Sequence, residues 1–129
     1  GRTIIPAKYR ERLGETFIIT RGLDGCLYLY PSDAWQEFAD KLQSLPSTLQ
    51  NRKIQRQFLS KAMEVSLDKQ GRILVPALHR EMADLEKDVV FVGMMNRVEL
   101  WDKARYNTEE TEEDEELLAS AMDTLDISL

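Results

Sequence analysis

The chain is organised around one stretch, which reads Ser66-Leu67-Asp68-Lys69-Gln70-Gly71-Arg72-Ile73-Leu74-Val75-Pro76. Apolar residues alternate with polar ones over 63–67, which is the period of a half-buried strand. Residues 68–71 have turn chemistry, since Gly71 accepts a positive φ without steric cost. An apolar run over 73–75 follows, and Pro76 suits the first turn of a helix. The stretch therefore predicts a strand, a turn, a second strand and the start of a helix.

The turn carries an arginine four residues after a carboxylate. The side chain of Asp68 can accept hydrogen bonds from backbone N–H groups just ahead of it, and it can also orient Arg72. Two interpretations are open at this point. The pair is either a local hairpin ion pair without a function, or a rigid turn that presents an arginine to a partner.

The same unit occurs twice in the chain. Residues 1–11 lie over residues 71–81, and both copies have Gly, Arg, Pro, Ala, Arg and Glu at identical places. After one added residue the match resumes, with 17–20 over 88–91, Gly22 over Gly93, and 27–30 over 98–101. A repeat of this length predicts one supersecondary unit present twice and related by a pseudo-twofold axis.

The sequence begins inside the first copy of the motif. The position that matches Asp68 precedes Gly1, and so does the strand that matches 63–67. Either the chain is truncated at its N-terminus or its start was placed late. We therefore expect the first motif to have its arginine, Arg2, without an aspartate of its own.

Length and cysteine content bound the class of protein. With 129 residues, each repeat alone is too short to bury a large core, so we expect two repeats that share a core or an oligomer of several chains. Cys26 is the only cysteine, which excludes an intrachain disulfide and favours a reducing cytosol. No apolar run reaches membrane-spanning length and no signal-like start is present, so no membrane partner is expected.

The net charge of −6 is unevenly distributed. Residues 1–101 carry 15 Lys and Arg against 13 Asp and Glu, whereas residues 102–129 carry 2 against 10. The acidity belongs to the C-terminal segment, and the body is mildly basic. Because local patches set the attraction to phosphates, the net charge does not exclude a nucleic-acid partner.

The remaining patterns predict short elements of both kinds. Periodicity, capping residues and breakers indicate helices over 6–13, 32–45, 47–61 and 76–83, with Ser47-Thr48-Leu49-Gln50 as a capping box for the third. Strands are expected over 17–20, 26–30, 89–92 and 97–101. A polar linker and an acidic amphipathic helix are expected after residue 102, with Leu117, Leu118, Ala121, Met122 and Leu125 at helical spacing.

The helix expected over 47–61 is basic on one side. It carries Arg52, Lys53, Arg56 and Lys61 opposite an apolar face. This basic side is either a solvated face or a face that contacts phosphates or another subunit.

No constellation of catalytic residues is present in the sequence. There is no Ser/His/Asp set, no Cys/His pair and no phosphate-binding Gly loop with a Lys. His79 is the only histidine and has no cysteine nearby, so neither a metal nor a cofactor is expected. Cys26 lies in an apolar strand pattern and is expected to be a buried structural thiol. We expect neither an enzyme nor a small-molecule substrate.

The duplicated Gly-Arg-(apolar)-Pro-Ala-x-x-Arg unit resembles the MraZ family of bacterial transcription regulators, part of the wider AbrB-like swapped-hairpin group. The family mark Asp-x-x-x-Arg is complete over 68–72 and half-present as Gly1-Arg2. Further matches are Thr20-Arg21-Gly22-Leu23-Asp24-Gly25-Cys26, Leu67-Asp68-Lys69-Gln70-Gly71-Arg72-Ile73 and Asn96-Arg97-Val98-Glu99-Leu100-Trp101. The resemblance covers residues 1 to about 106 and leaves the acidic tail unmatched.

The resemblance implies an α+β fold with two pseudo-twofold-related AbrB-like swapped-hairpin β-barrel repeats, a helical hairpin between them and a C-terminal acidic helix. The implied division is 1–45 and 62–106 for the repeats, 46–61 for a connecting helix and 107–129 for the tail. It also implies a ring-shaped homo-oligomer in the cytoplasm, at the nucleoid, that binds double-stranded DNA at promoter direct repeats. The promoter that the family is associated with is that of the cell-division and cell-wall gene cluster.

The resemblance also assigns roles to the motif residues. Arg2 and Arg72 are the DNA-reading arginines, and Asp68 orients Arg72. Chemistry supports this role, because a guanidinium matches guanine O6 and N7 in the major groove, and Lys69 in the same turn can meet a phosphate. The DNA-binding set is then Gly1, Arg2, Asp68, Lys69, Gly71 and Arg72.

The first motif departs from the family pattern, and this puts DNA binding by the first repeat in doubt. A competing hypothesis is a ring-forming interaction protein whose Asp-x-x-x-Arg turns are structural ion pairs between subunits. The two hypotheses differ in whether both arginines face solvent on one side or point into an interface. An AbrB-type antitoxin is a third possibility, but such a protein usually has one repeat.

Overall fold

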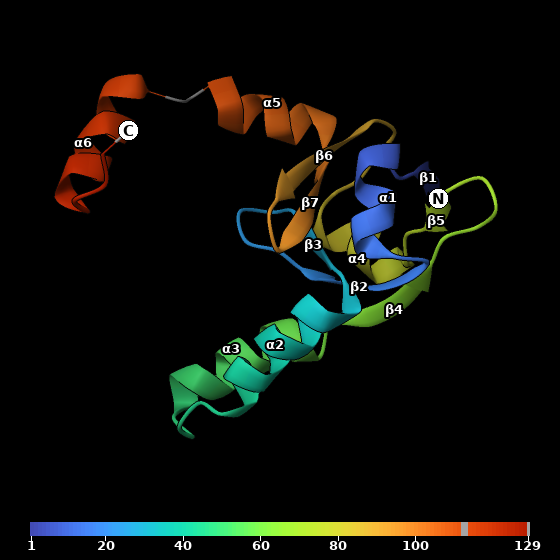
Figure 1. Cartoon of the computed structure of the whole chain (residues 1–129), viewed down its shortest axis with the longest axis horizontal. Helices are drawn as coiled ribbons and strands as arrows, with labels where there is room; N and C mark the ends of the chain where they lie inside the picture. Colours follow the sequence, from blue (N-terminus) through green and yellow to red (C-terminus); the bar gives the residue numbers. More distant parts are fainter. Residues whose placement is uncertain (112–113, 129) are drawn as a thin grey trace.

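The computed structural model describes residues 1–111 and 114–128, and its architecture is α+β (Figure 1). The described strands are β1 (Arg2–Ile4), β2 (Thr16–Arg21), β3 (Leu27–Tyr30), β4 (Met63–Ser66), β5 (Arg72–Leu74), β6 (Val89–Met94) and β7 (Arg97–Asp102). The described helices are α1 (Ala7–Leu13), α2 (Ser32–Gln43), α3 (Leu49–Leu59), α4 (Ala77–Met82), α5 (Lys103–Thr111) and α6 (Glu115–Thr124).

The described strands form two antiparallel sheets around one apolar core. The larger sheet has the order β4-β2-β3-β7-β6, and the smaller one is the two-stranded pair β1–β5, called the ribbon below. Hydrogen bonding among the described strands leaves two sheets and not one continuous cylinder. Both repeats contribute to the core, which confirms that they share it; its buried residues are Ile5, Leu13, Phe17, Ile19, Leu27, Leu29, Val65, Ile73, Val75, Ala83, Val98 and Leu100.

The pairing registers obey a twofold relation within the chain. The ribbon pairs Arg2 with Leu74, Thr3 with Ile73, and Ile4 with Arg72. In the alignment of the repeats, Arg2, Thr3 and Ile4 correspond to Arg72, Ile73 and Leu74. Replacing each residue by its counterpart gives the same three pairs again. β3 and β7 behave in the same way, with Tyr28 opposite Glu99 at the centre. The pseudo-twofold axis that the repeat predicted therefore passes through the middle of both pairs of strands.

The register also corrects the sequence alignment of the repeats between residues 17 and 22. Ile19 pairs with Leu29, whereas Leu100, the counterpart of Leu29, pairs with Phe91. The counterpart of Ile19 is thus Phe91, and the alignment with Val90 was wrong by one residue. Ile19 is buried in the core and Phe91 packs against it. A slip of one residue in a strand exchanges its two faces, which a match of β-branched residues cannot detect.

Helices α2 and α3 form the expected hairpin, which projects from the body (Figure 1). The capping residue differs from the prediction, since the side chain of Thr48, and not that of Ser47, accepts a hydrogen bond from Asn51 N at 3.0 Å. The hairpin ends on an aromatic cluster at the outer face of the larger sheet. In it, Tyr30 stacks on Phe38 with ring centroids 5.4 Å apart, and Phe58 meets Phe38 edge-on.

The C-terminal segment is more helical than expected. The polar linker predicted after residue 102 was wrong over 103–111, where α5 forms and packs Tyr106 against Trp101. Arg105 of α5 also reaches the β2–β3 loop, where its Nε donates to the carbonyl of Asp24. The expected acidic amphipathic helix is present as α6, which stands apart from the body (Figure 1).

One apolar residue of the opening motif is not where alternation placed it. Val65 is buried, but Met63 is 45% exposed although it pairs with the buried Ile19, because β4 is an edge strand of the larger sheet. The proposed division of the chain at residues 45, 61 and 106 stays a prediction.

Candidate nucleic-acid interface

The turn after β4 is held closed by Asp68. Its Oδ1 accepts hydrogen bonds from the backbone N–H groups of Gln70 and Arg72, both at 2.9 Å. The backbone of Asp68 closes the same turn, donating to the Arg72 carbonyl and accepting from Gly71 N. Gly71 has φ 76°, as its turn position requires. The turn thus fixes where Arg72 leaves the backbone.

Both motif arginines converge on this one carboxylate. Arg72 Nε donates to Asp68 Oδ2 at 2.9 Å, and Arg2 Nη1 lies 3.6 Å from the same oxygen. The Arg2 and Arg72 side chains are 52% and 40% exposed, whereas that of Asp68 is 22% exposed. Two guanidinium groups therefore lie side by side. The Asp68 carboxylate orients both of them, and both remain open to solvent.

Hydrogen bonds keep Asp68 ionised. The Arg72 backbone N–H has the largest effect in lowering the pKa of this carboxyl, and the Arg72 side chain and Gln70 N–H add to it. A lowered folded-state pKa means that the contribution of the charged carboxylate is present above its unfolded pKa of about 4 and is lost only as pH falls through the folded value. At neutral pH the turn keeps its negative charge between the two arginines.

The ribbon presents both arginines on one face. Because side chains alternate along a strand, residues 2 and 4 share a face of β1, and residues 72 and 74 share the corresponding face of β5. The inner position Ile73 is buried. The outer face consists of Arg2, Ile4, Arg72 and Leu74, with Ile4 61% and Leu74 55% exposed.

Two further arginines each lie beside the motif glycine of the opposite repeat, and the sequence analysis assigned them no role. Arg10 of α1 donates from Nε to the carbonyl of Ile5 and lies under Gly71, where an added Cβ would be 2.4 Å from its Cζ. Arg80 of α4 lies in the same way near Gly1, where an added Cβ would be 3.3 Å from Nη1. Their identical places in both repeats were the available signal.

The other predicted site residues lie at the edges of this face. Lys69 is exposed at the tip of the turn. The carbonyl of Gly1 accepts from Val75 N, and its counterpart Gly71 accepts from Ile5 N at 2.9 Å. The structure therefore brings all six predicted residues together at one end of the molecule.

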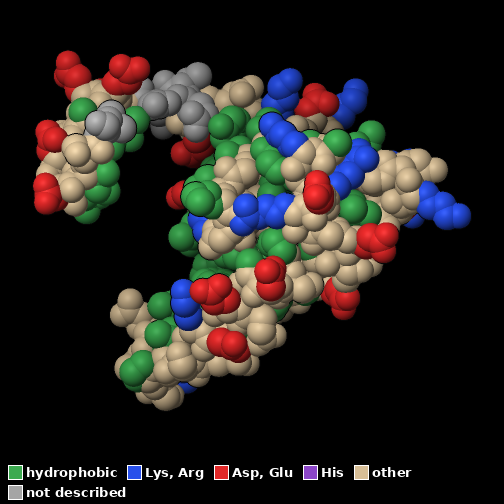
Figure 2. Space-filling view, viewed as in Figure 1, with side chains coloured by type: hydrophobic (Ala, Val, Ile, Leu, Met, Phe, Trp, Pro, Cys, Tyr) green, Lys and Arg blue, Asp and Glu red, His purple; other side chains and the backbone are tan. Residues whose placement is uncertain are grey.

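The surface charge follows the same division. Figure 2 shows several Lys and Arg side chains over α1 and the end of the body that carries the ribbon. On the C-terminal helix, the charged side chains in this view are acidic. The ribbon end is thus suited to a polyanion, whereas α6 is not.

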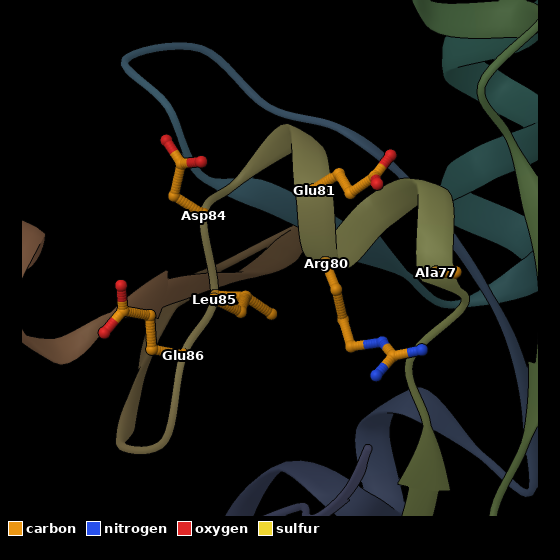
Figure 3. Close-up of a pocket in the computed structure, with 6 residues that line it drawn as sticks. All are labelled: Ala77, Arg80, Glu81, Asp84, Leu85 and Glu86. Atoms are coloured by element: carbon orange, nitrogen blue, oxygen red, sulfur yellow. The ribbon is translucent and has the colours of Figure 1, made fainter.

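No other described site has converging chemistry. A hollow of about 410 Å³ lies beside α4, but its charged side chains diverge, with Arg80 pointing away from Glu81, Asp84 and Glu86 (Figure 3). In the described ranges, no three His, Cys, Asp or Glu residues are placed to hold a metal ion. Burial raises the pKa of the Cys26 thiol to about 12, so it is unsuited to act as a nucleophile. Among the described helices, none has the length and apolar character needed to cross a membrane.

Comparisons of the sequence with a family model and with known proteins point to the same family. The family model described as "MraZ protein, putative antitoxin-like" matches residues 1–57 and again residues 58–127. "Transcriptional regulator MraZ" of Halothermothrix orenii is 48% identical over 130 residues, covering 98% of this chain and 91% of the relative. The protein of the same name from Lachnoclostridium phytofermentans is 47% identical over 84% of this chain and 77% of its own length.

A third relative, "Transcriptional regulator MraZ" of Caldanaerobacter subterraneus, is 53% identical over 80% of this chain and 73% of the relative. The family model matches the chain twice, in agreement with the two repeats of the fold. By sequence and by this duplication, the chain belongs to the MraZ family.

Proposed function

We propose that the chain is a sequence-specific DNA-binding regulator of transcription that reads DNA with the outer face of the ribbon. The observation that carries the proposal is the convergence of Arg2 and Arg72 on the Asp68 carboxylate, with both side chains open to solvent. The names of the relatives, all "Transcriptional regulator MraZ", support the same function.

The ribbon has the right shape for the major groove. That groove admits a two-stranded antiparallel ribbon, and arginine bidentate to guanine O6 and N7 is its commonest specific contact. The two guanidinium groups share one carboxylate oxygen, so they are close enough to reach neighbouring base pairs, which are about 3.4 Å apart. Lys69 at the tip of the turn then contacts a phosphate and positions the ribbon. Gly1 and Gly71 leave room for Arg80 and Arg10 beneath it.

We further propose that the protein works as a ring-shaped homo-oligomer on promoter direct repeats. The outer face of the larger sheet supports self-association, because the aromatic cluster there leaves Trp35, Phe38 and Phe58 only partly buried by the chain itself. A ring that repeats one ribbon at regular intervals meets successive operator elements from the same side when these are about one helical turn apart, ~10 bp. Weak single contacts then add through effective concentration.

The remaining parts of the proposal are its compartment and its partners. We propose that the protein works in the cytoplasm, at the nucleoid. The free, buried thiol of Cys26 agrees with a reducing compartment. Double-stranded DNA and further copies of the chain are the partners, with no membrane, cofactor or small-molecule substrate and no catalytic activity. We propose that the operator lies at the promoter of a cell-division and cell-wall gene cluster, as the resemblance of the motifs implies.

In vitro selection from a random duplex library, followed by footprinting, tests this function. The expected result is a G-containing element that recurs as a direct repeat. Inserting ~5 bp between elements should collapse cooperative binding, and ~10 bp should restore part of it. Equal affinity for selected and shuffled duplexes would contradict sequence-specific binding, and protection of a single inverted repeat would contradict the ring.

One observation, the ion pairs of Asp68, supports a second candidate function, that of a ring-forming interaction protein. Asp68 already pairs with both arginines, so the turn can be a structural ion-pair node of a ring-forming interaction protein. Light scattering separates the two. If Arg2→Ala and Arg72→Ala lower the assembly mass while selected DNA binds unchanged, the structural role is correct.

A further inference from the structure

The ribbon exposes two aliphatic side chains between its arginines. Ile4 and Leu74 are 61% and 55% exposed, although their strand neighbours Ile5, Ile73 and Val75 are buried. These aliphatic residues are not scattered, because the register places Leu74 opposite Arg2 and Ile4 opposite Arg72. Each cross-strand pair of the outer face thus combines one guanidinium with one aliphatic group.

This combination has a counterpart in the major groove. Side chains directly opposite in an antiparallel pair have Cβ atoms about 5 Å apart, which brings an arginine and its aliphatic neighbour over adjacent base edges. The major groove offers O6 and N7 acceptors on guanine and only one aliphatic group, the C5-methyl of thymine. A face of alternating guanidinium and aliphatic groups therefore matches guanine next to thymine better than it matches a run of guanines.

We propose that Ile4 and Leu74 are specificity-determining residues that recognise thymine C5-methyl groups beside the guanines read by Arg2 and Arg72. The inference rests on the proposed function and deepens it, because it names the chemical groups that the ribbon reads besides guanine. Both strands of the ribbon make the same kind of contact, since the pseudo-twofold axis relates Ile4 to Leu74 as it relates Arg2 to Arg72. The operator element then contains thymine within one or two steps of each contacted guanine.

Replacing thymine by deoxyuridine tests the inference, because it removes only the methyl group. The probe is a duplex selected by the intact protein from a random library, with each thymine next to a guanine replaced in turn. Burial of one methyl group corresponds to about a fourfold change in affinity, so each contacted position should weaken binding by about that factor. The same replacement in the flanking sequence should leave binding unchanged.

Variants of the ribbon complete the test. In Ile4→Thr and Leu74→Thr, strand propensity is kept, and the affinity for the unmodified duplex should fall by a similar factor. Each variant should also lose sensitivity to deoxyuridine at the position that its side chain contacts. Leu23→Ala is the matched control, since Leu23 is 57% exposed in the β2–β3 loop, which lies on the other side of the body from the ribbon (Figure 1). It should bind and discriminate like the unaltered chain.

The failures of the inference and of the proposed function can be told apart. If Arg72→Ala weakens binding and deoxyuridine has no effect at any position, the inference is wrong and the function stands. If neither change affects the affinity, the proposed function fails with it. A lowered assembly mass of Ile4→Thr, with unchanged DNA affinity, would show that a second copy covers this face and would overturn the inference.

Discussion

The two Gly-Arg pairs, at 1–2 and 71–72, contact the Asp68 carboxylate in different ways. Arg72 leaves a turn closed by the Asp68 side chain and donates to that carboxylate at 2.9 Å. Arg2 reaches the same carboxylate from the other strand of the ribbon, at 3.6 Å. The two arginines thus meet one carboxylate from different strands, and the shorter ion pair holds Arg72 more firmly than Arg2.

The largest expected effect is that of Arg72→Ala on specific DNA binding. Loss of a bidentate guanine contact costs about 1–3 kcal/mol per site, and the cost compounds in an oligomer. Arg2→Ala should weaken binding less, because its longer ion pair holds it less firmly. Fluorescence anisotropy on a selected duplex measures both, with exposed Lys41→Ala on α2 as the control and circular dichroism to verify the fold. An equal loss of affinity for the two variants would show that Arg2 and Arg72 are held equally well for DNA binding.

A smaller loss is expected for Asp68→Asn. The amide oxygen can still accept from the backbone N–H groups of the turn, but the charge between the two arginines is lost. We expect about fivefold weaker binding, in line with a charged hydrogen bond lost at a partly exposed site. Asp68→Asn combined with Arg72→Ala should add little to Arg72→Ala alone. Strict additivity in this cycle would mean that Asp68 does not act through the arginine.

The matched positions Tyr9 and His79 predict a pH dependence in one repeat only. The Tyr9 hydroxyl accepts from Gly93 N, whereas buried His79 donates from Nε2 to the carbonyl of Lys61 at 2.6 Å. Burial lowers the pKa of His79 below its usual 6.5, so the unfolded chain takes up a proton first. The free energy of unfolding should therefore decrease as pH falls below about 6.5. Denaturant titrations between pH 5 and 8 (roughly, the range of histidine) measure this, and His79→Gln should flatten the curve.

The smallest expected effect is that of removing the acidic tail on the binding of random DNA by the basic body. The segment 109–129 has 9 of the 23 acidic residues and no Lys or Arg. Its removal should strengthen binding to random duplex DNA at low salt by a few-fold, because the negative charge of the segment repels DNA phosphates at long range. The difference should vanish near physiological salt, where the Debye length is about 8 Å. An unchanged affinity at low salt would identify α6 as an assembly element.

Most of the elements could be predicted from local patterns. The turn at 68–71, both short helices after Pro6 and Pro76, and the α2–α3 hairpin follow from turn residues, breakers and periodicity. The α5 helix could not, since its sequence is polar and it depends on the packing of Tyr106 against Trp101. The alignment of the repeats was wrong by one residue at Ile19 and Phe91 for a related reason. The register of a strand depends on which side chains the partner strand and the core accept.

The candidate site was predicted in part. Asp68, Arg72 and Gly71 lie in one short turn, so the contacts among them could be predicted from the sequence. The positions of Arg10 and Arg80 could not be predicted from the sequence, because each side chain lies under a glycine of the other repeat.

The sequence alone determined the duplicated motif, the turn chemistry of Asp68 and Gly71, the family resemblance and the separation of a basic body from an acidic tail. These are local or compositional properties, and no distant contact is needed to produce them. Only the tertiary structure decided that β1 and β5 pair about a twofold axis, that Arg2 and Arg72 meet at one carboxylate, and that Ile4 and Leu74 are left outside. The physical reason is that strand pairing between residues far apart in the chain is selected by burial of one face in a shared core, and the opposite face is then the one exposed to solvent.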